Sequence, residues 1–367
     1  MRFTVSQSAL AKALGVVSKG IATTSAQPIL AGVKISASEG SLEFLSSDGN
    51  ISIRHAIPAN VEEAGATVVA GKVFQNVVKN LPDAAVTVED NGTQASLTCE
   101  RSHFRLNTLD PADFPEFPSI EPDRSIELPS ELLSTMVDKV YKVTSKDASR
   151  PILAGVLLTV ENNTIRLVAT DSYRLAVCDS NTETSQSDEA FEAIVPGTTF
   201  HDVLQLASAS ERIALGITAS QIVFSFGTTT YVSRRIEGNF PNFRQLLPST
   251  HSAAVALDAQ QLAQALRRVS VIAQSNPSVR LDVDADGGVL RLSTSSPDQG
   301  EANEMLGVEV EGESMSIALN YHYVLDCVNA VSTDSDVTLE LQSSMQPAIF
   351  KSYASINYLY LLMPVRM

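Results

Sequence analysis

The chain has no tryptophan, only three cysteines among its 367 residues, and no apolar run near the roughly 18–20 residues of a membrane-spanning helix. Cys99, Cys178 and Cys327 lie far apart, so they offer neither a zinc-binding spacing nor a disulfide framework, and we expect buried thiols. The opening residues, MRFTVSQSAL, lack the apolar stretch and cleavage site of a secretory signal. We therefore expect a soluble intracellular protein.

Signatures of the common enzyme classes are also missing. The sequence has no G-x-x-x-x-G-K-[ST], no G-x-G-x-x-G after a strand, no H-E-x-x-H and no G-x-S-x-G. Its five histidines neither cluster with cysteines nor pair at metal-ligand spacing. Acidic pairs such as Glu62–Glu63 lie in polar runs typical of solvated loops. The sequence predicts no catalytic residue, no metal site and no cofactor.

What is present is an ordinary globular composition with a strong negative charge. Hydrophobic residues make up 44% of the chain, and 26 basic against 42 acidic residues give a formal net charge of −16. At roughly 100–200 residues per domain, the length predicts two or three domains. Taken alone, the net charge argues against nucleic acid, because phosphates attract positive charge.

An internal repeat divides the chain into thirds. Residues 3–17, 126–140 and 255–269 align without a gap, at offsets of 123 and 129. Each passes from strand-like alternation to the i, i+3, i+4, i+7 spacing of an amphipathic helix. The apolar stripes are Leu10–Ala13–Leu14–Val17, Leu133–Met136–Val137–Val140 and Leu262–Ala265–Leu266–Val269.

A second strand-then-helix unit recurs in each third, at 67–82, 192–208 and 316–332. Phe74, Phe200 and Val324 occupy one equivalent place in it, and Val77, Val203 and Cys327 follow three residues on, where a core stripe would continue. Runs rich in Val, Ile, Leu and Thr between the helices predict antiparallel hairpins. We predict an α+β fold of three repeated domains, each with two helices packed on antiparallel sheets. Their expected bounds are 1–120, 124–249 and 253–367.

Positive charge is concentrated on the predicted helices. The six helical windows, 7–20, 70–80, 129–146, 196–212, 258–274 and 320–332, hold ten basic and six acidic residues, a net of +4 that leaves −20 elsewhere. Basic side chains stand opposite the apolar stripes, which is typical of solvated helix faces but also predicts a basic surface. No aromatic residues interleave with the lysines, so contacts with nucleic acid would be to phosphates, without sequence preference.

Four segments resist a purely structural explanation: SRPILAGV at 149–156, ATDSYRLAV at 169–177, EGNFPNFRQLLP at 237–248 and LYLLMPVRM at 359–367. On these, placed in the corresponding thirds, the whole chain resembles the bacterial sliding clamp, the β subunit of DNA polymerase III. The resemblance implies a head-to-tail homodimeric ring of six domains, with helices lining a bore that duplex DNA passes through. Basic helix faces then predict these DNA-binding residues: Lys12, Lys19, Lys72, Lys79, Lys139, Lys142, Lys146, Arg267 and Arg268. One departure is Thr24, where clamps of the best-known type carry an arginine that contacts DNA.

The resemblance also implies a pocket between the second and third domains that binds short linear motifs of client proteins. Carried over residue by residue, it would use Arg150, Leu153, Thr170, Ser172, Tyr173, Arg174, Leu175, Pro241, Gln245, Leu246, Asn320, Tyr323, Pro347, Leu361, Met363, Pro364, Val365, Arg366 and Met367. We expect an apolar cleft whose Arg150, Arg174 and Asn320 bind peptide carbonyls or an acidic side chain. Ser172–Tyr173 replaces a Gly–His pair common in the family, and Gln245 stands where a basic residue is frequent, so client preference should differ.

The implied function is a non-enzymatic processivity factor of the DNA polymerase holoenzyme. It would tether the replicative polymerase and dock repair polymerases, ligase, mismatch-repair proteins and the clamp loader, which supplies the ATP site that this chain lacks. We expect it in the cytoplasm, on the nucleoid when loaded, without membrane contact. Two other classes stay open: a nuclease or transferase with an unrecognised site, and a threefold scaffold without a nucleic-acid role.

Overall fold

The computed structural model describes residues 1–367 except 25, 182–189, 274–275, 332–335 and 366–367. The described chain forms two compact units. Met1–Glu131 and Asp202–Arg235 make the first unit, and Leu132–His201 and Ile236–Met367 make the second. The central third of the sequence therefore contributes to both units.

Each third of the described sequence contains two α-helices. They are α1 (Gln7–Val17), α2 (Gly71–Lys79), α3 (Ser130–Val140), α4 (Gly197–Leu206), α5 (Ala259–Val269) and α6 (Tyr321–Ala330). All six are shorter than the predicted windows, and after three of them the chain continues in a 3-10 turn: η1 (Ser18–Gly20), η4 (Tyr141–Val143) and η6 (Ala207–Ala209). Side chains cap three helix starts: Ser6 Oγ accepts from the Ala9 N–H at 3.3 Å, Asp258 Oδ1 accepts from the Gln261 N–H at 2.8 Å, and Asn320 caps α6.

The predicted apolar stripes form the core. All twelve stripe residues of α1, α3 and α5 are buried, as are Phe74, Phe200 and Val324 in the second helix of each third. In α2 the stripe continues through the fully buried Val78, whereas Val77 is only half-buried. The three cysteines are buried, as predicted.

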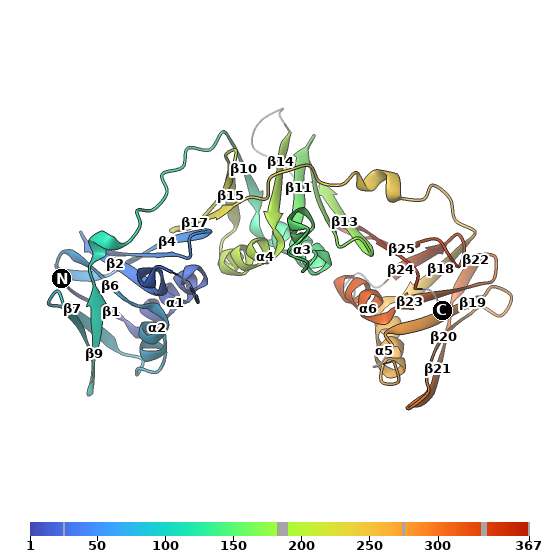
Figure 1. Cartoon of the computed structure of the whole chain (residues 1–367), viewed down its shortest axis with the longest axis horizontal. Coiled ribbons are helices and arrows are strands. Elements are labelled where there is room, and N and C mark those ends of the chain that lie inside the picture. Colours follow the sequence, from blue (N-terminus) through green and yellow to red (C-terminus); the bar gives the residue numbers. More distant parts are fainter. Residues whose placement is uncertain (25, 182–189, 274–275, 332–335, 366–367) are drawn as a thin grey trace. The chain divides into compact units, whose positions relative to one another are not determined.

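A 13-stranded sheet spans the first unit. Its strands are β1 (Arg2–Ser6), β2 (Gly32–Ser38), β3 (Ser41–Ser47), β4 (Ile51–Pro58), β5 (Asn60–Glu63), β6 (Gly65–Ala70), β7 (Ala85–Asp90), β8 (Gln94–Cys99), β9 (Ser102–Leu109), β10 (Arg124–Pro129), β15 (Arg212–Ile217), β16 (Gln221–Phe226) and β17 (Thr229–Arg234). The antiparallel pair β17–β4, with Tyr231 opposite Ile53, joins strands of the second third to those of the first. Helices α1 and α2 lie side by side (Figure 1), linked by a 2.8 Å hydrogen bond from Gln7 Nε2 to the Val78 carbonyl.

The second unit contains a nine-stranded and a four-stranded sheet. The larger one runs in the order β14 (Phe191–Pro196), β11 (Gly155–Glu161), β12 (Thr164–Thr170), β13 (Arg174–Asn181), β26 (Asn357–Leu362), β25 (Ala348–Tyr353), β24 (Asp336–Leu341), β18 (Ala253–Asp258) and β22 (Glu309–Gly312). The smaller one contains β21 (Gly300–Gly307), β20 (Val289–Ser296), β19 (Ser278–Asp284) and β23 (Met315–Asn320). The antiparallel pair β13–β26 joins the second and third repeats into one sheet.

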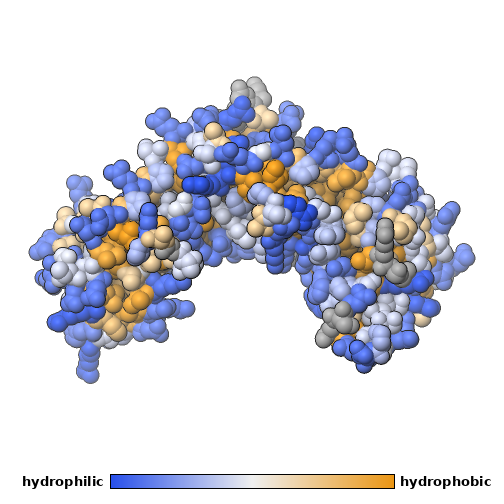
Figure 2. Space-filling view, viewed as in Figure 1, coloured by the Kyte–Doolittle hydropathy of each residue, from blue (hydrophilic) through white to orange (hydrophobic). Residues whose placement is uncertain are grey.

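Polar and charged side chains cover most of the visible surface, with apolar patches between them (Figure 2). None of the helices in the described part of the chain is long and apolar enough to cross a membrane.

Candidate functional sites

Three predicted pocket residues lie side by side on one face of the nine-stranded sheet. Thr170 of β12 is paired with Leu175 of β13, and Leu175 is paired with Leu361 of β26. Leu175 and Leu361 are buried in one apolar cluster, against which Phe240 and Phe243 pack. Ile152 packs against the same cluster, so residues from all four segments that carry the resemblance meet at the β13–β26 joint.

The turn between β12 and β13 contains two exposed residues, Ser172 and Tyr173. Asp171 Oδ1 accepts hydrogen bonds from the N–H groups of Tyr173 at 2.9 Å and Arg174 at 3.1 Å. Ser172 has a φ of 79°, the left-handed region that favours glycine. The Met363 N–H donates to the Tyr173 carbonyl at 2.9 Å, so Tyr173, 60% exposed, and Met363, 43% exposed, stand close together.

The remaining predicted pocket residues differ in exposure. Pro241, Gln245, Leu246 and Val365 are exposed, whereas Pro347 and Pro364 are half-buried. Leu153 is buried in the 3-10 turn η5 (Pro151–Ala154). Asn320 uses its Oδ1 to cap α6, accepting from the His322 N–H at 3.0 Å. Arg366 and Met367 lie outside the described residues.

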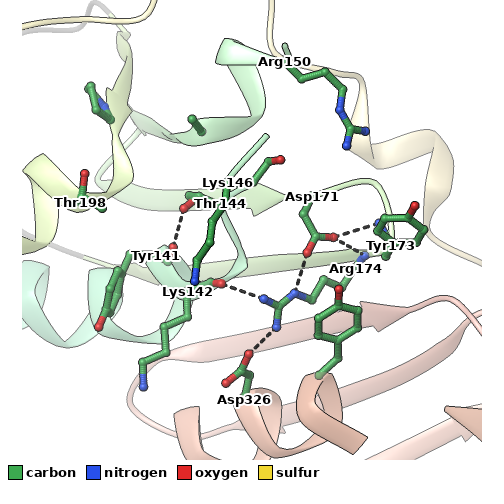
Figure 3. Close-up of a pocket in the computed structure, with 14 residues that line it drawn as sticks. Tyr141, Lys142, Thr144, Lys146, Arg150, Asp171, Tyr173, Arg174, Thr198 and Asp326 are labelled. Atoms are coloured by element: carbon green, nitrogen blue, oxygen red, sulfur yellow. Dashed lines mark hydrogen bonds and ion pairs between the residues drawn. The ribbon is translucent and has the colours of Figure 1, made fainter. Parts of the chain in front are cut away.

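A cavity of about 800 Å³ adjoins the turn (Figure 3). It is lined by Tyr141, Lys142, Thr144, Ser145, Lys146, Arg150, Ala154, Asp171, Tyr173, Arg174, Pro196, Thr198, Tyr323 and Asp326. Four of these are predicted pocket residues, and Lys142 and Lys146 are predicted DNA-binding residues. The two groups were predicted at separate sites, but in the structure residues of both line one cavity, and most of its lining side chains carry a charge or a hydroxyl group.

Arg174 is the central charge of this cavity, and its donors are occupied within the chain. The side chain is almost fully buried, with Nε 2.9 Å from Asp171 Oδ2 and Nη1 2.5 Å from Asp326 Oδ2. Nη2 donates to the Lys142 carbonyl at 2.8 Å, and the guanidinium lies 4.2 Å from the centre of the Tyr323 ring. Arg174 therefore positions the β12–β13 turn against α6, and its contact with a client peptide stays a prediction.

Electrostatics keep this guanidinium charged. Burial alone would lower the pKa of Arg174, but Tyr360, Asp326 and Asp171 raise that pKa above its ordinary value. Arg150 differs, because it is exposed and donates from Nε to Asp147 Oδ2 and from Nη1 to Ser172 Oγ, each at 2.9 Å. Arg150 is thus the accessible arginine of the cavity.

Eight of the nine predicted DNA-binding side chains are exposed, as a basic surface requires. They are Lys12, Lys19, Lys72, Lys79, Lys142, Lys146, Arg267 and Arg268. Two are partly neutralised: Lys19 Nζ lies 2.8 Å from Asp202 Oδ1, and Arg268 forms a two-point pair with Glu304 at 2.7 and 2.9 Å. Hydrogen bonding to Arg268 also lowers the pKa of Glu304.

Lys139 is the exception, and its prediction as an exposed DNA-binding residue is wrong. The residue is 6% exposed, and Nζ donates to the Ala330 carbonyl at 2.7 Å. Ala330 ends α6, where unpaired carbonyls and the helix dipole favour a cation. Lys139 thus caps a helix of the third repeat. The angle between Lys139 and the apolar stripe could not reveal this second packing partner.

The acidic residues that hold Arg174, Asp171 and Asp326, were not among the predicted site residues. Asp171 lies inside the quoted segment ATDSYRLAV, and Asp326 lies three residues after Tyr323, on the same face of α6. The sequence signal for the ion pair was the aspartate three residues before Arg174. Among the described residues, no group of three or more His, Cys, Asp or Glu side chains is arranged to hold a metal ion.

Comparisons with known proteins cover the whole chain. Sequence profiles of the DNA polymerase III beta subunit match residues 1–118 (N-terminal domain), 127–242 (central domain) and 244–366 (C-terminal domain). Curated relatives include the beta sliding clamps of Streptomyces coelicolor and Synechococcus elongatus, each 29% identical over 100% of both chains. Similar solved structures include the DNA polymerase sliding clamp from Bacillus subtilis, with a TM-score of 0.93 and 27% identity over 100% of this chain and 99% of that one. A sliding clamp from Pseudomonas aeruginosa bound to griselimycin has a TM-score of 0.93 and 25% identity over 100% of both chains.

Proposed function

The chain belongs to the family of the DNA polymerase III beta subunit, the bacterial sliding clamps, and we infer that it is a DNA sliding clamp that supports replication. Three family domains in tandem over the whole chain carry this inference. A clamp of this kind is a mechanical tether, so its function needs binding surfaces rather than reacting groups. We place it in the cytoplasm, on the nucleoid when loaded.

We propose that two copies close head to tail into a ring of six domains around duplex DNA. The domain matches support division of each chain at 1–120, 124–249 and 253–367. A closed ring is held on DNA by topology, so weak phosphate attraction suffices and sliding stays possible. The exposed lysines of α1 and α2 and the exposed arginines of α5 would supply that attraction.

Two exposed strand edges support assembly with a second copy. Along most of its length β9 is paired only with β8, and β21 is the edge strand of the four-stranded sheet. Each carries a large apolar side chain in solvent, Phe104 at 40% exposure on β9 and Met305 at 60% on β21. Edges of this type pair readily with another chain. We propose that β9 of one copy meets β21 of the other.

We propose that clients dock beside Tyr173 and Met363, on the face where Leu175 and Leu361 meet. The replicative polymerase, the clamp loader, repair polymerases, ligase and mismatch-repair proteins would compete there through short linear motifs. Exposed Leu246, Tyr173 and Met363 offer apolar contacts, and Arg150 offers a charge-assisted donor. Deleting residues 363–367 should abolish binding of a polymerase-derived motif peptide without changing dimer mass. Unchanged peptide affinity would contradict this pocket assignment.

Retention on circular DNA tests the clamp function. The protein, loaded with a clamp loader and ATP onto nicked circular DNA, should co-elute with the circle through gel filtration and be lost after the circle is cut once. A scaffold would never be retained, and a nuclease or transferase would show divalent-metal-dependent turnover of the DNA. Either result would contradict the proposed function.

A further inference from the structure

Four directly paired side chains form a row across four neighbouring strands of the nine-stranded sheet. Arg166 of β12 is opposite Asp179 of β13, Asp179 is opposite Asn357 of β26, and Asn357 is opposite Tyr353 of β25. Because side chains alternate along a strand, directly paired residues share one face of the sheet. We call these four residues the polar row.

The polar row lies on the same face as the proposed client pocket. Starting from the pair Asp179–Asn357, the next pair on this face of β13 and β26 is Val177–Leu359. The pair after that is Leu175–Leu361, which belongs to the proposed pocket. Val177, Leu175 and Leu361 are buried in one apolar cluster, and Leu359 packs against it. A continuous apolar floor therefore connects the pocket with the polar row.

A second cavity, of about 280 Å³, lies over the polar row. Its lining consists of Arg166, Val177, Asp179, Phe243, Arg244, Leu247, Tyr353, Asn357, Tyr358 and Leu359. Phe243 and Arg244 belong to the 3-10 turn η7 (Phe243–Leu246), and the same turn carries the pocket residues Gln245 and Leu246. The turn η7 therefore contributes to both sites, and the two sites adjoin along it.

The charges of this cavity favour an anion. Arg166 Nε lies 3.6 Å from Asp179 Oδ1, too far for a hydrogen bond, and both side chains are about one-third exposed. Arg244 is exposed, its guanidinium lies 5.7 Å from the centre of the Phe243 ring, and no ion pair to it is found among the described residues. Asp179 is the one acidic residue of the lining. Two arginines against one aspartate give the lining a positive charge in a chain of net charge −16.

We propose that this cavity is a second client subsite, which binds an acidic side chain of a client peptide next to the residues that fill the pocket. The proposal rests on the proposed client-docking function. Arginine recognises a carboxylate through two parallel N–H groups, and a guanidinium gives up less hydration than an ammonium when it does so. Tyr353, 73% exposed at the end of the polar row, lines the same cavity and would pack against the peptide there. The acidic residue would add affinity and select among clients that share the same hydrophobic anchors.

Fluorescence anisotropy with matched peptides tests this subsite on the full-length protein. The probe is a labelled motif peptide from a replicative polymerase, extended at either end through a Gly-Ser spacer by three glutamates or, as the control, by three glutamines. For one of the two ends, the glutamate peptide should bind the unmodified protein about fivefold more tightly than its glutamine control at low salt. The double variant Arg166→Gln, Arg244→Gln should lose this gain while binding the glutamine peptide unchanged. Arg291→Gln, which removes an exposed arginine of β20, should keep the gain.

The outcomes separate the two proposals. Equal affinity of glutamate and glutamine peptides for the unmodified protein would overturn the second subsite, as would a gain that survives in the double variant. Competition for the gain by a single-stranded oligonucleotide would assign the cavity to nucleic acid and also overturn it. If the glutamine peptide does not bind at all, the client pocket itself fails. In that case glutamate-peptide binding that the double variant abolishes would still support the subsite, and its absence from the unmodified protein would overturn both proposals.

Discussion

Replacing Arg174 by methionine should destabilise the second unit while preserving side-chain bulk. The substitution leaves Asp171, whose side chain is 13% exposed, and Asp326, 34% exposed, without their shared cation. Removing one partner of a buried ion pair costs about 3–5 kcal/mol. Because water can reach Asp326, we expect the lower end, about 3 kcal/mol. The physical reason for this loss is that the Arg174 side chain links β13 to Asp326 of α6.

Tyrosine fluorescence during urea unfolding measures this loss. The chain has no tryptophan, and seven of its eight tyrosines lie in the second unit, so the signal reports mainly on that unit. In a thermal scan the same loss should lower the midpoint by about 6–12 °C for a unit of about 200 residues. Arg166→Met is the matched control, because its partly exposed pair with Asp179 should contribute less than about 1 kcal/mol. A loss below about 1 kcal/mol for Arg174→Met would refute the reasoning, as would a loss equal to the control's.

Three further perturbations address the DNA surface, the β12–β13 turn and a titrating histidine. Replacing the exposed Lys12 and Lys142 by glutamate should shorten retention on nicked circles about tenfold, and unchanged retention at low salt would contradict the basic-surface assignment. Ser172→Gly should raise the free energy of unfolding in urea by about 1 kcal/mol, because it relieves a positive φ, and a decrease would show that the turn is unstrained. Burial lowers the pKa of His55, which hydrogen-bonds Thr229 at 2.9 Å, so the unfolded chain binds the proton more readily and stability falls as pH drops below about 6.5. His55→Gln should flatten this part of the stability profile between pH 7.5 and 5, and an unaltered slope would count against it.

Local patterns predicted the helices and their buried faces. The stripe Leu262–Ala265–Leu266–Val269 is buried as its spacing requires, and Asp258 caps the helix that it precedes. Such features depend on residues within one or two turns, which a sequence displays directly. The threefold repeat supplied the domain number for the same reason.

Contacts between distant residues could not be predicted in the same way. Lys139 caps α6 across 191 positions, and Arg174 reaches Asp326 across 152. Local spacing marks neither partner. The sequence therefore predicted a solvent-exposed Lys139 and an Arg174 open to a peptide ligand. The joints β17–β4 and β13–β26 are likewise long-range pairings, and the second of them builds the candidate pocket.

The most direct test of the ring is its appearance. Two-dimensional class averages of the purified protein, recorded by electron microscopy at a concentration where light scattering gives twice the 39.3 kDa chain mass, should show a closed six-part annulus with a central hole. Compact particles without a hole, at either the chain mass or its double, would contradict the account.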